Sequence, residues 1–244
     1  MIDLLKSVDD LARQKYDVLV PTMGALHAGH QSLIKLAKSK SDQVLVSIFV
    51  NPLQFENKDD LANYPKSLER DLELAKAAGA TAVFAPSESV IYPGDIEKIS
   101  AGPIGDLYEG QARPGHFSGV LTVVKRLFDL VKPKAAVFGE KDFQQLFLIK
   151  QLVNQLKLPI EIISAPTIRE KNGLAISSRN IRLDKSGEKI SDVIYKALTQ
   201  PTIDQMISEI STEPGFKLDY LEVIDELTFD YDPAELGIKP EMAV

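Results

Sequence analysis

Short apolar runs alternate along the chain with longer amphipathic segments. The apolar runs predict strands, and segment 44–50 (VLVSIFV) is almost wholly apolar, as is typical of a strand buried on both faces. The amphipathic segments carry apolar residues three and four positions apart, which is the spacing of one helical face. The expected strands are 18–20, 44–50, 81–85, 135–138 and 160–164, and the expected helices are 29–39, 66–78, 117–131 and 142–156.

Repeated strand–helix–strand units predict an α/β fold, a Rossmann-like parallel sheet with helices on both faces. Ligands of such sheets bind outside the carboxyl ends of the strands, so the loops at 21–30, 51–64, 139–145 and 166–179 are the places to look for chemistry. The pattern then changes, with helices expected at 185–198 and 201–211 and a strand of mixed polarity at 216–225. We therefore expect a Rossmann-like domain over 1–178 and a small α+β domain over 179–244.

The composition narrows the functional classes. The formal net charge of −7 disfavours general nucleic-acid binding, because a nucleic-acid binder needs a basic face to neutralise phosphates. The absence of cysteine excludes disulfides, thiolate metal sites and a cysteine nucleophile. No apolar run approaches the ~18 residues that span a bilayer, and no signal-peptide core is visible. We expect a cytoplasmic protein that has neither a membrane nor a nucleic acid as a partner.

The turn from the first strand into the first helix carries the most distinctive chemistry. Its sequence is PTMGALHAGH (21–30), with His27 and His30 three positions apart. That spacing places both imidazoles on one side of a helix start, where free N–H groups and the helix dipole attract phosphate. The alternatives are that one histidine caps the helix while the other is solvated, or that both bind a metal, for which no acidic or cysteine ligand lies nearby. A P-loop is excluded because His30 and Gln31 replace its lysine and hydroxyl residues.

Three further loops offer polar groups at the same edge of the sheet. Gln54 can donate and accept through one amide, which suits a hydroxyl substrate, although a loop residue bonded to backbone is an equal alternative. Lys141 can reach a phosphate, while Asp142 can accept from ribose hydroxyls or cap the next helix. The polar, cationic turn at 177–179 (SSR) suits a mobile triphosphate clamp or is a plain surface loop.

Other charged residues have weaker cases. Arg113 could contact a phosphate or a carboxylate, whereas His116 is expected to be structural. Asp59, Asp60 and Asp71 could help to hold magnesium, but surface carboxylates are common and solvation is expected for each. No residue is therefore predicted as a metal ligand.

The turn at 21–30 resembles the His-x-Gly-His signature of nucleotidyltransferases and class I aminoacyl-tRNA synthetases. With four further segments, it is more closely similar to the pantoate–β-alanine ligase (pantothenate synthetase) family. The segments are SIFVNPLQF (47–55), RPGHFSGVLTVV (113–124), FGEKDFQQ (138–145), and IRE (168–170) through SSRN (177–180), in the same order and with similar spacing. One departure is Ile176, where the family usually has methionine.

The resemblance implies ATP- and Mg²⁺-dependent condensation of (R)-pantoate with β-alanine through an enzyme-bound pantoyl adenylate, with release of AMP and pyrophosphate. It implies catalytic roles for His30, His27 and Lys141, contacts from Gln54 to both substrates, a homodimer, and a second domain, here shorter than usual, that closes as a lid. The implied ATP contacts are Met23, Gly24, Ala25, Leu26, His27, Ala28, Gly29, His30, Gly139, Glu140, Lys141, Asp142, Ile168, Ile176, Ser177, Ser178 and Arg179. The implied substrate contacts are Gln54, Gln145, Pro21, Met23, Asn51, Val120 and Arg113.

Two other functions stay open from the sequence. A simple nucleotidyltransferase would join AMP or CMP to a phosphorylated substrate and would release pyrophosphate but never AMP. A nucleotide-binding sensor would keep the fold without the reaction, and the presence of His27, His30 and Lys141 argues against it. A tRNA synthetase is disfavoured by the charge of −7 and by the lack of an anticodon-binding portion.

Overall fold

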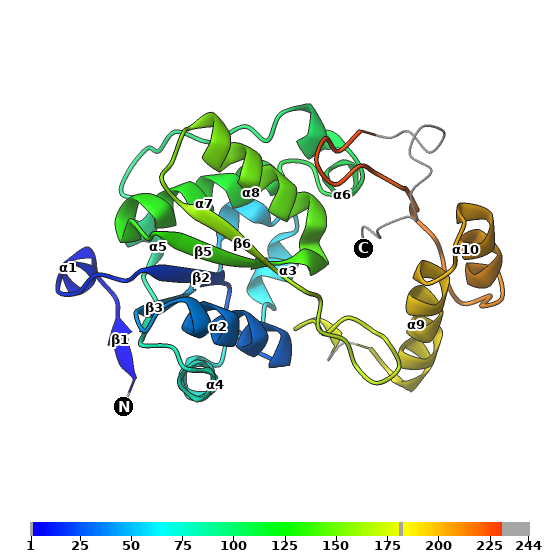
Figure 1. Ribbon diagram of the computed structural model, residues 1–244, viewed down its shortest axis with the longest axis horizontal. Helices are drawn as coiled ribbons and strands as arrows, with labels where there is room; N and C mark the ends of the chain where they lie inside the picture. The colour runs from blue at the N-terminus through cyan, green and yellow to red at the C-terminus, as the bar shows by residue number, and fades with distance from the viewer. Residues whose placement is uncertain (1, 181–182, 231–244) are drawn as a thin grey trace. The chain divides into compact units, whose positions relative to one another are not determined.

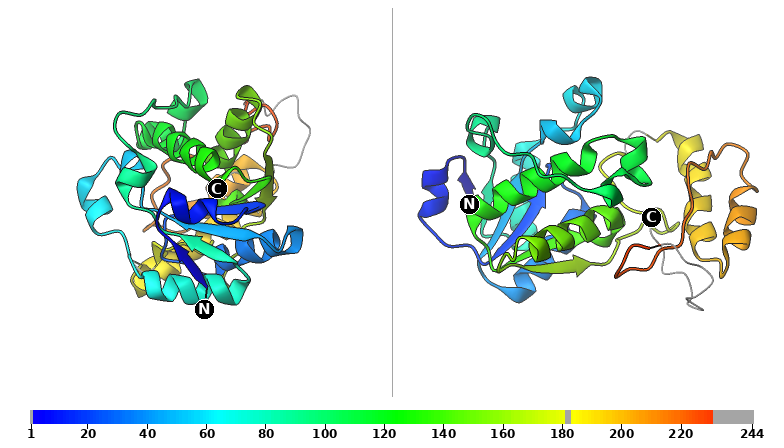
Figure 2. Two further views of the ribbon diagram at one scale, coloured as in Figure 1. Left: turned by 90° about the vertical axis from the view of Figure 1, so that its left-hand side faces the viewer. Right: turned by 90° about the horizontal axis from the view of Figure 1, so that it is seen from above.

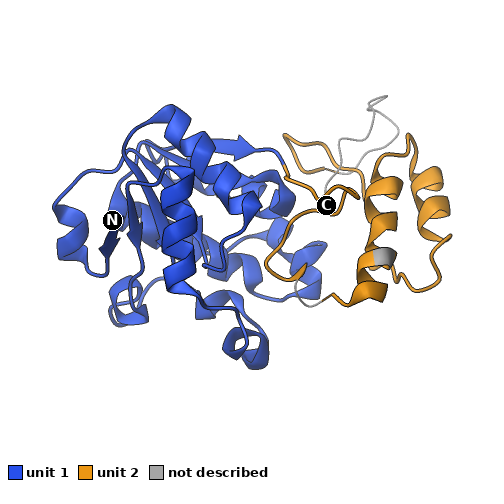
Figure 3. Ribbon diagram, turned by 90° about the horizontal axis from the view of Figure 1, so that it is seen from below, with its two compact units in different colours: residues 1–166 blue, residues 167–244 orange. Residues whose placement is uncertain are grey.

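The computed structural model describes residues 2–180 and 183–230. The chain forms two compact units, Met1–Pro166 and Thr167–Val244 (Figure 3). The division precedes the expected boundary at 178 because the turn at 176–179 continues a hairpin of the second unit, in which the Ile176 N–H donates to the Ile168 carbonyl at 3.0 Å. Residues 231–244 of the expected second domain lie outside the described residues.

The first unit contains a six-stranded, all-parallel sheet in the order β1-β4-β3-β2-β5-β6 (Figure 1). The strands are β1 (Asp3–Leu5), β2 (Val18–Thr22), β3 (Val44–Ile48), β4 (Ala82–Phe84), β5 (Ala135–Gly139) and β6 (Glu161–Ala165). The Rossmann-like prediction is confirmed, and β2 to β6 lie where apolar runs predicted strands. The chain proceeds outward on one side of β2 and then returns to its other side, so β2 and β5 meet at the switch point of the sheet.

Helices cover both faces of the sheet (Figures 1 and 2). The helices α2 (Ala28–Lys40) and α4 (Leu68–Ala78) pack on one face, and α7 (His116–Val131) and α8 (Phe143–Gln155) pack on the other. All four were predicted within two residues at each end. The connections contain α1 (Val8–Ala12), α3 (Lys58–Ala62), α5 (Glu88–Ile91) and α6 (Glu109–Ala112), with the 3₁₀ turns η1 (Pro52–Gln54), η2 (Pro103–Asp106) and η3 (Glu140–Asp142).

The central strands are apolar on both sides because each side is covered. Leu19 and Leu45 belong to the core beneath α7 and α8, while Val20 and Val46 belong to the core beneath α2 and α4, and all four side chains are fully buried. A shift of one residue would place leucines in the core that holds valines and the reverse, so close packing on both faces favours the observed register between β2 and β3. Because the central strands are parallel, the loops that follow them all begin at the carboxyl ends of the strands, on the same side of the sheet.

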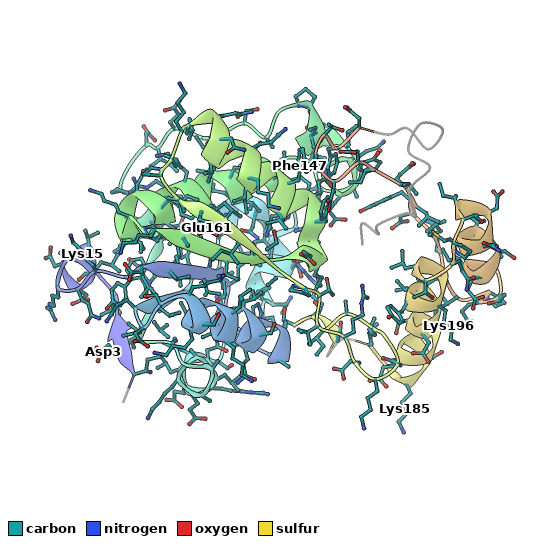
Figure 4. All side chains as sticks on the ribbon, in the orientation of Figure 1. Asp3, Lys15, Phe147, Glu161, Lys185 and Lys196 are labelled. Atoms are coloured by element: carbon teal, nitrogen blue, oxygen red, sulfur yellow. The ribbon has the colours of Figure 1, made fainter. Side chains whose placement is uncertain are left out.

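The described part of the second unit contains α9 (Lys185–Leu198), α10 (Ile203–Ile210) and a hairpin closed by a bridge between Arg169 and Ala175. Both helices were predicted, and Lys185 and Lys196 lie on α9 (Figure 4). None of the helices in the described ranges of either unit is long and apolar enough to cross a membrane.

The strand expected at 216–225 is wrong, because among the described residues this stretch forms no regular structure. Its apolar side chains have another use: Phe216 and Leu221 pack against Met206 and Ile210 of α10. A strand of mixed polarity also requires a neighbouring strand to satisfy its backbone groups. The local pattern was compatible with a strand, but packing on the helices decides the outcome.

Candidate active site

The candidate site lies at the carboxyl ends of the central strands, where three loops begin. One loop joins β2 to α2, a second follows β3 into η1, and the third joins β5 to α8 through η3. Because β2 pairs with both β3 and β5, the three loops start from adjacent strands (Figure 1). The sheet thus brings together candidate residues from 21–30, 51–54 and 139–145.

The two histidines form a reciprocal cap at the start of α2. Nδ1 of His27, the N-cap residue, accepts from the Gly29 N–H at 3.1 Å, and Nδ1 of His30 accepts from the His27 N–H at 3.3 Å. A neutral imidazole that accepts at Nδ1 carries its proton at Nε2. The ring centroids are 4.0 Å apart, so the pair presents two neighbouring Nε2–H donors, and neither has an acceptor among the described residues. Capping and ligand binding are therefore compatible, because they use different nitrogens.

Both imidazoles are neutral at pH 7. The pKa of His30 is lowered to about 3, mainly by burial and then by the nearby His27 and Lys141, with Asp142 opposing them. Burial and the charge of Lys141 also lower the pKa of His27. The pair can therefore stabilise an anion by donating hydrogen bonds, and His30 can release a proton only after a bound anion has raised its pKa.

The backbone before the histidines is held by an aspartate of α4. The Asp71 carboxylate accepts from the Ala25 N–H at 3.0 Å and from the Leu26 N–H at 2.7 Å. Gly24 has a φ of +85°, and a side chain there would lie 3.0 Å from the Asp71 carboxylate. Asp71 is only 1% exposed, and burial raises its pKa although the two amide bonds oppose that effect. The expectation of a solvated Asp71 is wrong, because this carboxylate anchors the loop.

Sequence reasoning missed this anchor although the chain contains a weak signal for it. Asp71 precedes Ala75 and Ala78 by four and seven positions, so the three side chains share one face of α4, and all three are buried. A carboxylate on the buried face of a helix requires hydrogen-bond partners. The sequence could have indicated a buried aspartate here, but not which amides it holds.

Lys141 and Asp142 follow β5 and form an ion pair of 3.0 Å between Nζ and Oδ1. The charge of Lys141 acts on both histidines, which places it beside the paired rings. Asp142 is the N-cap residue of α8 but makes no side-chain cap bond, so its oxygens face Lys141 and solvent. Gly139 ends β5, and Glu140 is exposed. Lys141 is thus a predicted site residue of the first unit whose positive charge reaches both histidine rings.

Gln54 is buried at the end of η1, with 8% of its surface exposed. Its side-chain oxygen Oε1 accepts from Asn51 Nδ2 at 3.1 Å, and its backbone carbonyl accepts from His116 Nδ1 at 2.9 Å. Burial lowers the pKa of His116, so this ring is neutral and donates its Nδ1–H. The Gln54 side chain is therefore bonded to the Asn51 side chain and not to backbone, and its Nε2 has no acceptor among the described residues.

The other predicted substrate contacts of the first unit lie on elements around the same edge. Val120 is buried in α7, and Gln145 is a partly buried residue in the first turn of α8. Pro21 and Met23 are partly buried at the end of β2 and in the loop after it. Arg113 precedes α7 and pairs with Glu109 at 3.2 Å, so part of its guanidinium is already engaged.

The remaining predicted ATP contacts, Ile168 and 176–179, belong to the second unit. The Ile176 N–H bonds to the Ile168 carbonyl, and the Arg179 N–H bonds to Ser177 Oγ at 3.2 Å. Arg169 of the same hairpin stacks over the ring of Tyr195 on α9, with 4.8 Å to the centroid. Hydrogen bonds to the hairpin therefore give the turn at 176–179 a defined backbone conformation within this unit.

Comparison with known proteins gives a consistent set of matches. The family model described as Pantoate-beta-alanine ligase matches residues 2–242. The chain is 46% identical over 235 residues to the pantothenate synthetase of Acidothermus cellulolyticus, which covers 91% of this chain and 78% of that protein. The pantothenate synthetase of Thermus thermophilus superimposes with a TM-score of 0.90 at 38% identity, covering 94% of this chain and 90% of that one. A Francisella tularensis pantoate–β-alanine ligase complexed with β-γ ATP and β-alanine gives a TM-score of 0.83 at 40% identity, covering 92% and 90%.

Proposed function

Since this chain belongs to the pantoate–β-alanine ligase family, we propose that its reaction passes through an enzyme-bound pantoyl adenylate formed at the carboxyl ends of β2 and β5. Like the rest of the family, it condenses pantoate with β-alanine in an ATP-dependent reaction. The observation that carries the proposal is the pair of Nε2–H donors of His27 and His30, whose tautomers are fixed by backbone amides at a helix start.

In the proposed first step, a carboxylate oxygen of pantoate bonds to the α-phosphorus of ATP. The bond from that phosphorus to the bridging oxygen breaks, and pyrophosphate leaves with the electron pair. His27 and His30 donate hydrogen bonds to phosphate oxygens, and Lys141 supplies a positive charge beside them. No protein nucleophile is required, so the contribution of the protein is positioning and stabilisation of negative charge.

In the proposed second step, the amine of β-alanine bonds to the activated carbonyl carbon, the bond to the phosphate oxygen breaks, and AMP leaves. The attacking nitrogen must be neutral, because an ammonium has no free electron pair. It becomes positively charged as it bonds to carbon, and it then releases one proton to solvent to give the amide. Gln54 and Gln145 bind polar groups of the substrates, and Pro21, Met23 and Val120 supply apolar contacts. Arg113 is the proposed partner for a carboxylate or phosphate.

Magnesium enters this proposal with the nucleotide. Among the described residues no group of three histidine, cysteine or acidic side chains could hold a metal ion, and both oxygens of Asp71 are bonded to amides. The residues present therefore do not form a magnesium site by themselves, and no step is assigned to the ion. Mg²⁺ commonly binds through phosphate oxygens and water with one or two carboxylates, which suits Mg-ATP as the substrate.

The roles of the second unit and of a second copy of the chain rest on the family resemblance. We propose that Ile168, Ile176, Ser177, Ser178 and Arg179 contact ATP, with Arg179 binding phosphate. We also propose that the unit acts as a lid and that the enzyme is a homodimer. An Arg179→Ala variant should raise KM for ATP, and sedimentation equilibrium should give twice the chain mass. An unchanged KM for ATP in the Arg179→Ala variant would contradict the phosphate contact. A monomer at assay concentration would contradict the homodimer.

The decisive experiment separates capping from catalysis. Asparagine is a good helix cap, so His27→Asn and His30→Asn keep an oxygen near the position of Nδ1 but remove the Nε2–H. Pantoate-dependent exchange of pyrophosphate into ATP, measured without β-alanine, reports the adenylate step. We expect each variant to lose at least about 100-fold in exchange rate while keeping its melting temperature. The His27→Ala and His30→Ala variants should lose both exchange and stability.

If the asparagine variants retain exchange, the rings are only caps and the proposal fails. Mass detection of pantothenate and AMP from pantoate, β-alanine and Mg-ATP checks the complete reaction. A nucleotidyltransferase would release pyrophosphate without AMP, and a sensor would bind ATP without turnover. The same two assays therefore distinguish the ligase from both alternatives.

A further inference from the structure

We propose that Tyr92 and Asn51 are positioning residues that fix the side-chain amide of Gln54 so that it meets the substrate as a hydrogen-bond donor. The inference rests on the proposed role of Gln54 in binding pantoate. It concerns how that contact is oriented, and it adds Tyr92, a residue at the end of α5 that no sequence motif indicated.

Asn51 has no hydrogen-bonding capacity left for a substrate. Its Nδ2 donates to Gln54 Oε1 at 3.1 Å and to the Gly119 carbonyl at 3.0 Å. Its Oδ1 accepts from the Leu53 N–H at 3.2 Å and from the Tyr92 hydroxyl at 2.7 Å. A primary amide has two donors and two acceptor positions, so all four are occupied, and Asn51 is only 1% exposed. Asn51 therefore acts on the substrate through Gln54.

The bond from Asn51 decides which end of the Gln54 amide faces the site. Oε1 of Gln54 accepts from Asn51, so a rotated amide would place its NH₂ group against the NH₂ group of Asn51. Two opposed donors are unfavourable in a buried position. Gln54 Nε2 therefore faces away from Asn51 with its two N–H groups, and a hydroxyl or carboxylate oxygen is the group that it recognises.

Tyr92 fixes Asn51 in turn. The Tyr92 ring packs edge-on against Phe49, with 5.9 Å between centroids, which directs the hydroxyl toward Asn51. Burial raises the pKa of Tyr92, so the hydroxyl keeps its proton and donates it to Oδ1. The Leu53 N–H and the Gly119 carbonyl select the same orientation of the Asn51 amide, and the contact with Tyr92 is the shortest of the four.

The backbone of Gln54 is held by different contacts. The His116 ring donates to its carbonyl, and α7 lies so close that a side chain at Gly119 would come within 2.2 Å of the Leu53 carbonyl oxygen. These contacts do not involve Tyr92. Loss of the Tyr92 hydroxyl should therefore loosen Asn51 and, through it, the Gln54 side chain, while η1 stays in place.

The test uses Tyr92→Phe and Asn51→Asp in the full-length enzyme. Tyr92→Phe should raise KM for pantoate about tenfold, the effect of one lost hydrogen bond, and should leave KM for ATP within about twofold. Asn51→Asp presents carboxylate oxygens to Gln54 and should turn its amide around, with a rise of about 100-fold in KM for pantoate. Tyr16→Phe is the matched control. Tyr16 is a buried tyrosine just before the amino end of β2, whereas the candidate site lies at the carboxyl end of that strand. This control should leave both constants unchanged.

A double-mutant cycle separates positioning from a general structural role. In a Gln54→Ala background, Tyr92→Phe should add nothing to KM for pantoate. The proposal is overturned if Tyr92→Phe leaves KM for pantoate unchanged, or if it adds its full factor in that background. Production of pantothenate and pantoate-dependent pyrophosphate exchange by the unaltered enzyme test the proposed function separately. If both occur and Tyr92→Phe has no effect, only the positioning role is wrong.

Discussion

His30 makes the stability of this protein depend on pH. Its pKa of about 3, against an ordinary value of 6.5, means that between these values the folded protein binds fewer protons than the unfolded chain. The stability that the neutral ring supplies is therefore fully present above pH 6.5 and is lost as the pH falls toward 3. Each pH unit in this window changes the free energy of unfolding by about 1.4 kcal/mol, so a fall to about pH 5 should cost about 2 kcal/mol.

The variant His30→Asn isolates this effect, because an asparagine oxygen can accept from the His27 N–H but does not titrate. Urea or thermal unfolding of both proteins at about pH 7.5 and pH 5 gives the comparison. The original protein should lose about 2 kcal/mol more than the variant, or about 4–8 °C more in melting temperature. His27 is present in both proteins, so the difference reports the titration of His30 together with its charge coupling to His27. Equal losses would refute the reasoning, since they would mean that His30 titrates as a solvated histidine does.

Three further predictions concern the loops around the site. Asp71→Asn turns one acceptor for the loop amides into a donor and should raise KM for ATP about tenfold in steady-state assays. An unchanged KM would show that the loop keeps its conformation without this acceptor. Gly24→Ala adds a contact at 3.0 Å to a strained φ of +85° and should cost about 1–3 kcal/mol in urea unfolding. Gly94→Ala, with φ +77° and no atom within 4 Å, is its control, and equal losses would contradict the role of the contact. Gly119→Ala places a methyl 2.2 Å from the Leu53 carbonyl oxygen and should raise KM for pantoate by more than about tenfold, and a normal KM would mean that η1 tolerates displacement.

The sheet could be predicted from the sequence wherever a strand is buried on both sides. β3 contributes Val44, Leu45 and Val46, which are all fully buried, and such a run is visible without knowledge of its neighbours. β1 left no comparable signal, because it is a three-residue edge strand that begins with the exposed Asp3 (Figure 4). It exists because Leu4 aligns with Val83 of β4, a pairing that one strand's sequence does not reveal.

Some contacts of the candidate site could likewise be predicted from the sequence, and others could not. His27 and His30 are close in sequence and share one helix start, so their proximity followed from helical geometry. The Asp71 contact with Leu26 spans 45 residues, and the Tyr92 contact with Asn51 spans 41. Such partners are set by how α4 and α5 pack, and the sequence alone offers many carboxylates and hydroxyls that could have filled the same role.

The three best-positioned polar side chains of the site share one arrangement. His27 and His30 each use Nδ1 at the helix start, and Gln54 uses Oε1 for Asn51, so the Nε2 atom of each side chain remains for the proposed ligand contacts. In each case the bond to the protein determines that the free atom is a donor, so no reorientation is needed when negative charge develops.

Neutral donors also suit the position of Lys141. Its charge lowers the pKa of both rings, so two imidazolium ions beside it would repel each other and the ammonium in a partly buried site. With neutral rings, Lys141 supplies positive charge beside them without that repulsion, and the two Nε2–H donors add hydrogen bonds to the proposed triphosphate. A bound triphosphate would reverse the balance by favouring protonation, which couples any proton release from His30 to the presence of substrate.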